Sequence, residues 1–287
     1  MIQQFLSSWA LFHNTYLAGW LISLLLSLIG VLVVARNQIF IGAAVSQAAT
    51  LGIACGMWAG ALFAADAGAF VRSDQFLSAL AVAFSIMAAA ATARAGDAGQ
   101  DSHAAVTGWV FLTSASFSIL VLSHSPHGLE EVHRLLSSSI IGAAASDVWV
   151  FAALLLLTTL FIASNRPRII LFAMDPLMAA AVGTRTTLWE GLLSFWLGLV
   201  VGLSIRASGM LYTFGCLVLP ALAAGNLCRE VRSMFVVAPI IGLVTAVVGF
   251  VVADRYDFPP AQMTVALLGV LLPLAWLVRQ VRTRRSI

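Results

Sequence analysis

Imidazole and carboxylate side chains crowd one polar segment, residues 124–133, which lies between two long apolar runs. On a helix, residues four apart are neighbours, so His127 would meet Glu131. Imidazole and carboxylate ligands together suit zinc, with manganese less favoured. The segment is therefore a candidate site for receiving a metal ion. Its candidate ligands are His124, His127, Glu131 and His133.

The same segment also has the features of an amphipathic helix on the outer membrane surface. Ser125 followed by Pro126 is typical of a helix start, and apolar residues then recur at helical spacing. Glu130 and Arg134 stand four residues apart and can pair on the solvated face of such a helix. The sequence leaves the metal site and the solvated helix both open.

Catalytic chemistry finds little support in the chain. All fifteen basic residues are arginine, so neither a P-loop lysine nor a Schiff-base lysine exists. His-Glu-x-x-His and Gly-x-Ser-x-Gly motifs are absent, and no two carboxylates face each other from the centres of apolar runs. The three cysteines show no paired spacing and fit small buried residues. The sequence argues against an enzyme, and equally against a proton-coupled transporter.

The composition requires a membrane. Hydrophobic residues make up 61% of the 287 residues and charged residues only 9%, whereas a soluble domain carries roughly 25% charged residues. The arginines are scattered at the ends of apolar runs and form no patch for nucleic acid. The first arginine is Arg36, so the first apolar run lacks the basic start of a cleavable signal and is expected to be retained.

Apolar runs long enough to cross a bilayer predict an all-α, polytopic bundle of about eight to nine transmembrane helices in one domain, residues 1–287. With the N-terminus outside and the C-terminus in the cytoplasm, most arginines fall on the inner side, as the positive-inside rule requires. The candidate spans lie near residues 17–35, 42–65, 75–93, 106–123, 147–165, 188–206, 210–227, 233–253 and 261–279.

A short capped helix is predicted on the cytoplasmic side, within residues 171–187. Asp175 is a good N-cap, Pro176 fits the first turn, and Gly183 fits the stop. About two turns of helix follow from these signals. A permease would offer such a helix to a separate motor protein.

Small residues recur at every fourth position in two of the spans. The rows are Gly52, Gly56 and Gly60 in the second span and Ser194, Gly198 and Gly202 in the sixth. This spacing lets helix backbones approach closely, so we expect these residues to pack helices together.

Several stretches in one order resemble a known family. They are a glycine-led stretch at 42–48, an acid-then-glycine stretch at 101–108, the capped segment at 175–183, Ser-Gly-Met-Leu at 208–211, Leu-Pro-Ala-Leu-Ala-Ala at 219–224, and Tyr-Asp-Phe-Pro-Pro at 256–260. Together they resemble the permease subunits of the ABC-3 family, which take up zinc, manganese or iron. Through the last stretch, the resemblance ranks Asp257 above Asp254 as an outer metal ligand, although a structural loop cap or a contact with a binding protein is equally compatible.

The chain departs from the family at two positions of the first motif. Where the family has aspartate and histidine, this sequence has Ala43 and Gln47. Alanine cannot ligate a metal, and a glutamine amide is a weak neutral ligand. The departure weakens the metal assignment more than the permease assignment.

The resemblance implies a permease subunit of an ABC importer in a bacterial inner membrane, without a permanently bound cofactor. It implies a homodimer, a cytoplasmic ATPase that binds around Asp175, Pro176 and Gly183, and an outer solute-binding protein. The expected cargo is a divalent metal ion, zinc first and then manganese or iron. The alternatives are an importer of a metal chelate or other small solute, and a membrane scaffold that transports nothing.

Overall fold

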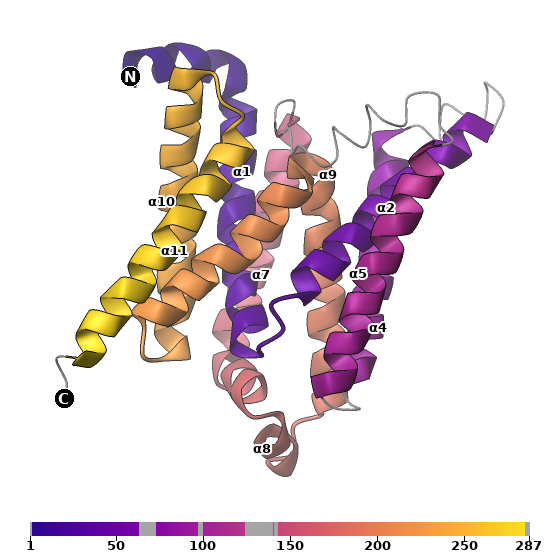
Figure 1. The fold of residues 1–287 in the computed structure, drawn as a ribbon, viewed down its shortest axis with the longest axis vertical. Helices are drawn as coiled ribbons and strands as arrows, with labels where there is room; N and C mark the ends of the chain where they lie inside the picture. The colour runs from indigo at the N-terminus through magenta and orange to yellow at the C-terminus, as the bar shows by residue number, and fades with distance from the viewer. Residues whose placement is uncertain (1, 63–72, 97–99, 124–139, 141–142, 285–287) are drawn as a thin grey trace. The chain divides into compact units, whose positions relative to one another are not determined.

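The computed structural model describes residues 2–62, 73–96, 100–123, 140 and 143–284 (Figure 1). All regular structure among these residues is helical, which confirms the predicted all-α class. The helices are α1 (Ile2–Ala35), α2 (Ile41–Leu62), α4 (Asp74–Gly96), α5 (Gln100–Ser123), α7 (Ala145–Met174), α8 (Pro176–Ala181), α9 (Thr186–Leu227), α10 (Val231–Tyr256) and α11 (Pro260–Arg284).

Eight of the described helices, all except α8, are long and apolar enough to cross a bilayer. The sixth and seventh predicted spans both fall within α9, which has 42 residues and a non-helical break at Gly209. At 1.5 Å per residue α9 is about 63 Å long, roughly twice the hydrocarbon thickness. The length and the break together give α9 enough helix for two crossings.

Helix α7 runs further than its predicted span. The span was expected to end at residue 165, but the helix continues to Met174 through a kink at Asn165, two residues before Pro167. Proline lacks an N–H and clashes with the preceding turn, which bends a helix without always ending it. Because Ile169 and Phe172 beyond the kink are fully buried, packing holds the last two turns in place.

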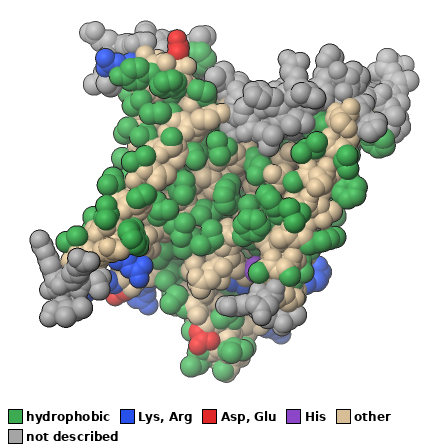
Figure 2. Space-filling view, viewed as in Figure 1, with side chains coloured by type: hydrophobic (Ala, Val, Ile, Leu, Met, Phe, Trp, Pro, Cys, Tyr) green, Lys and Arg blue, Asp and Glu red, His purple; other side chains and the backbone are tan. Residues whose placement is uncertain are grey.

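The helices fall into two compact units. Unit 1 contains α1, α7, α8, the second half of α9, α10 and α11, and unit 2 contains α2, α4, α5 and the first half of α9. The chain passes from unit 2 to unit 1 after Met210, one residue after the break at Gly209. Figure 2 shows hydrophobic side chains over the middle of the visible face, as expected of a surface that meets lipid.

In unit 2 the two rows of small residues have a common neighbour, α4. A β-carbon on Gly52 would meet the carbonyl of Leu80 at 2.5 Å, and one on Gly198 would meet the Cα of Ile86 at 2.6 Å. The Ser85 hydroxyl donates to the Gly198 carbonyl at 2.6 Å. The expected close packing is confirmed for Gly52, Gly56, Gly198 and Gly202, each of which has α4 atoms against it.

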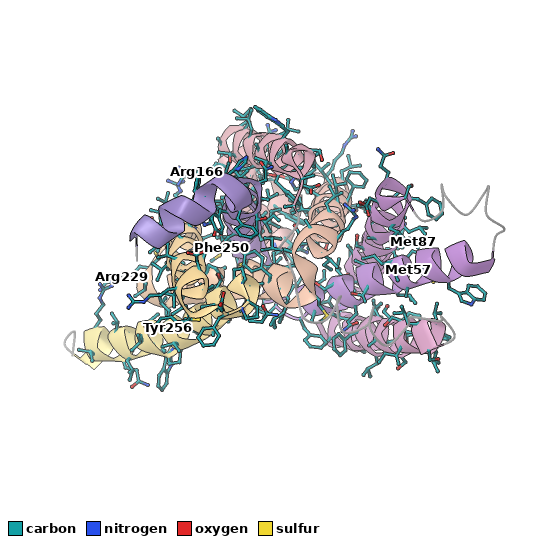
Figure 3. The ribbon with its side chains drawn as sticks, turned by 90° about the horizontal axis from the view of Figure 1, so that it is seen from above. Met57, Met87, Arg166, Arg229, Phe250 and Tyr256 are labelled. Carbon is teal, nitrogen blue, oxygen red and sulfur yellow. The ribbon has the colours of Figure 1, made fainter. Side chains whose placement is uncertain are left out.

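In unit 1, α1 packs along α10. The Ser23 hydroxyl donates to the Gly242 carbonyl at 2.9 Å, and the Tyr16 hydroxyl donates to Asp254 Oδ1 at 3.2 Å. Phe250, labelled in Figure 3, packs edge-on against Tyr16 and Tyr212. These contacts join the first span of the chain to one of its last.

Candidate functional site

Helix α8 forms as its sequence predicts. The Asp175 carboxylate accepts a hydrogen bond from the Met178 backbone N–H at 2.9 Å, and Pro176 occupies the first turn. Gly183 follows the helix with φ +85°, a left-handed conformation that glycine adopts without a Cβ penalty. The backbone N–H of Gly183 donates to the Ala180 carbonyl at 2.9 Å and so closes the last turn. All three residues expected at this segment therefore build its ends.

The surface of α8 is apolar and exposed. Leu177 is 85% exposed and Val182, which caps the helix, is 69% exposed, while Ala179 is buried. The helix itself is too short to cross a membrane. An apolar surface on a short helix that follows directly on a spanning helix is typical of a contact with another protein.

The structure describes only one of the expected metal ligands, Asp257. His124, His127, Glu131 and His133 lie outside the described residues, so their role as ligands stays a prediction. Among the described residues, no three His, Cys, Asp or Glu side chains come together to hold a metal ion.

Asp254 and Asp257, the two carboxylates predicted on the outer side, lie at the end of α10. Asp257 is the C-cap of α10, with φ +55°, and it is exposed. Asp254, three residues earlier, accepts the hydrogen bond from Tyr16. The loop-cap alternative thus accounts for Asp257 as it stands, and a metal role for it remains a prediction.

Gln47 of α2 contacts Met210, a residue that the sequence did not single out as part of a site. Gln47 is 8% exposed, and its Nε2 lies 3.2 Å from the sulfur of Met210, which is 163 residues away in sequence. Ser46, which is fully buried, has a hydroxyl without a hydrogen-bond partner among the described residues. The only sequence signal for Met210 was its place in the Ser-Gly-Met-Leu stretch.

The chemistry available at this point of unit 2 is neutral. Ala43 supplies no ligand, Gln47 supplies an amide, Met210 supplies a thioether and Ser46 a hydroxyl. Carboxylate and imidazole bind divalent metals more strongly than these groups, and a thioether favours soft ions. A metal whose charge is already compensated by a chelator asks less of such neutral groups than a bare divalent ion does.

Known proteins resemble this chain along most of its length. The manganese transport system membrane protein MntC of Halalkalibacterium halodurans is 22% identical over 271 residues, which cover 94% of this chain and 88% of that protein. The manganese import system permease protein ScaB of Streptococcus gordonii is 22% identical over 261 residues, covering 90% and 88%. A probable iron transport system membrane protein of Haemophilus influenzae is 23% identical over 173 residues, covering 60% and 61%.

Solved structures share the fold. PsaBC from Streptococcus pneumoniae, in complex with Fab, superposes with a TM-score of 0.77 at 18% identity, covering 96% of this chain and 95% of that one. An inward-facing putative metal-chelate type ABC transporter gives a TM-score of 0.72 at 17% identity, covering 91% and 84%.

The spans and these relatives make the chain a multi-pass membrane protein of the bacterial plasma membrane. The ABC 3 transport family matches residues 8–279, nearly the whole sequence. The chain therefore belongs to the ABC 3 transport family, whose relatives described here are named for metal transport.

Proposed function

We propose that this chain is the permease subunit of an ABC importer that moves a divalent metal, as a free ion or as a complex, into the cytoplasm. The observation that carries the proposal is α8, a capped, exposed, apolar helix in a chain that has no P-loop lysine of its own. A separate ATPase would dock on α8, two copies of the chain would form the pore, and a solute-binding protein would deliver the cargo outside.

ATP-driven movement of α8 would switch the pore between outward and inward access. The rigid caps of α8 support this role. The Met178 N–H donates to the Asp175 carboxylate at the start of α8, and the turn at Gly183 closes its end. The Asp175 N–H also donates to the Leu171 carbonyl of α7 at 2.8 Å, so a push on the apolar side of α8 would pass to α7.

The docking role is tested by Leu177→Gln. Leu177 is 85% exposed, so the variant should fold normally, yet it removes the most exposed apolar contact of α8. We expect at least tenfold weaker binding of the ATPase, about 1.4 kcal/mol, as at an apolar interface anchor. The matched control Leu177→Met keeps an apolar side chain and should bind normally. Equal ATPase binding by both variants would contradict the assignment of α8.

The cargo is tested by uptake into cells that express the chain with its ATPase and binding protein. The sequence predicts zinc as the first candidate cargo, while the names of the relatives mention manganese and iron. Each of the three ions is therefore supplied in turn. ATP-dependent accumulation of one ion would support the importer and identify that ion. An assembled complex whose ATPase responds to no substrate would instead support the scaffold alternative.

Gln47 and Met210 favour a second candidate cargo, a metal chelate, because the groups that meet there are neutral. The double variant Ala43→Asp/Gln47→His restores the acid and imidazole of the family pattern. If the natural cargo is a chelate, the double variant should gain uptake of the free ion and lose uptake of the chelate. If the natural chain already imports the free ion at the same rate as the double variant, a chelate is excluded as the natural cargo.

A further inference from the structure

Unit 1 contains a cavity of about 410 Å³ where α9 ends and α10 begins, beside the last turns of α11. Three arginines line it, Arg229, Arg279 and Arg282, together with Asn226, Cys228 and the backbone of Leu227. Arg229 is labelled in Figure 3, beside α11. None of the described lining residues is acidic. The cavity therefore concentrates positive charge.

The arginines are held in place. Arg279 Nη1 donates to Asn226 Oδ1 at 3.2 Å, and Arg282 Nη1 donates to the Leu227 carbonyl at 3.2 Å. A guanidinium has five N–H donors, so the bond from Arg282 orients its side chain without exhausting its donors. Orienting the side chains beforehand removes part of the entropy cost of binding an anion.

The cavity lies where apolar spans end. The span of α9 ends at Leu227, that of α10 begins at Val231, and that of α11 ends at Arg282. The turns of α11 that carry the arginines also expose Trp276, Val278 and Val281. Phosphate at headgroup depth and acyl chains along α11 would together match this combination of charged and apolar surface.

We propose that this cavity binds a phosphate-bearing anion, the headgroup of an anionic phospholipid or free phosphate. Guanidinium groups bind phosphate oxygens through paired, charge-assisted hydrogen bonds. In the orientation predicted from the arginines, this end of unit 1 faces the cytoplasm, where basic pockets between helices bind anionic headgroups.

Cys228 reports occupancy, because it lines the cavity. The other two cysteines, Cys55 and Cys216, lie within membrane spans, and Cys216 is completely buried. The full-length chain is placed in nanodiscs of phosphatidylcholine, of phosphatidylglycerol, or of phosphatidylcholine with inorganic phosphate in the buffer. Labelling of Cys228 by N-ethylmaleimide is followed by mass spectrometry, and an unlabelled Cys216 confirms that each variant is folded.

We expect slower labelling of Cys228 with phosphatidylglycerol than with phosphatidylcholine alone. Arg229→Gln and Arg279→Gln should each weaken the protecting anion roughly fivefold, the effect of about 1 kcal/mol per arginine at an anionic surface. The matched control Arg168→Gln removes an exposed arginine of unit 1 that does not line the cavity, and it should keep full protection.

The outcomes separate the two sources of phosphate. Protection by phosphatidylglycerol alone assigns the site to a lipid headgroup, and protection by inorganic phosphate assigns it to a soluble anion. No protection by either probe overturns the proposal. Protection that is lost equally in Arg168→Gln and Arg279→Gln also overturns it, because general surface charge would then explain the effect.

Discussion

Alanine at Gly198 should force apart the two helices that meet there. Its β-carbon would lie 2.6 Å from Ile86 Cα and 2.8 Å from Ile86 N, so the clash is with backbone and no rotamer change relieves it. Overpacking of this kind costs about 1 to 3 kcal/mol. If α4 moves away, the hydrogen bond from Ser85 to the Gly198 carbonyl is also lost, about 0.5 to 1.5 kcal/mol more. The expected loss of stability is therefore about 1.5 to 4.5 kcal/mol.

A matched control lies on the same helix. A β-carbon on Gly191 would have nothing within 4 Å, so Gly191→Ala gains the helix propensity of alanine without a clash. Because Gly198→Ala shares that gain, the difference between the two variants isolates the clash. Unfolding free energies from denaturant titration in detergent micelles give the difference directly. Equal stability of the two alanine variants would refute the close packing of α4 against α9.

Three further predictions concern single contacts. Tyr16→Phe removes the hydrogen bond to Asp254 and should lower the free energy of unfolding by about 1 to 2 kcal/mol in the same titration; an unchanged value would show that the bond contributes nothing. Burial raises the pKa of the Cys228 thiol, and Arg282 partly lowers it. The pKa read from the rate of alkylation against pH should therefore lie above that of free cysteine and rise further in Arg282→Gln. A lower pKa in Arg282→Gln would contradict this reasoning. Gly209→Ala places a side chain at φ +76° and ψ 173°, a region almost exclusive to glycine. The variant should lower the free energy of unfolding by about 1 to 3 kcal/mol and reduce transport. Normal stability and normal uptake would show that the break tolerates any residue.

Local features were predictable because their causes lie within a few residues. A bilayer selects long apolar runs, so hydropathy located the spans, although α1, α5, α7 and α11 extend several residues beyond them. Capping depends on the side chain and the next turn, so Asp175, Pro176 and Gly183 could be assigned to α8 directly. The spacing of the small residues in two spans predicted that they would pack against another helix, but it did not identify that helix.

Only the tertiary structure decided which distant residues meet. Both small-residue rows contact α4, Gln47 meets Met210 across 163 residues, and Arg279 and Arg282 approach the end of α9 across 53 and 55 residues. Helical periodicity fixes which side chains share a face, but the packing of whole helices fixes what that face touches. In the same way, the glycine at 209 was visible in the sequence, while the break that divides α9 there follows from the conformation that the fold imposes.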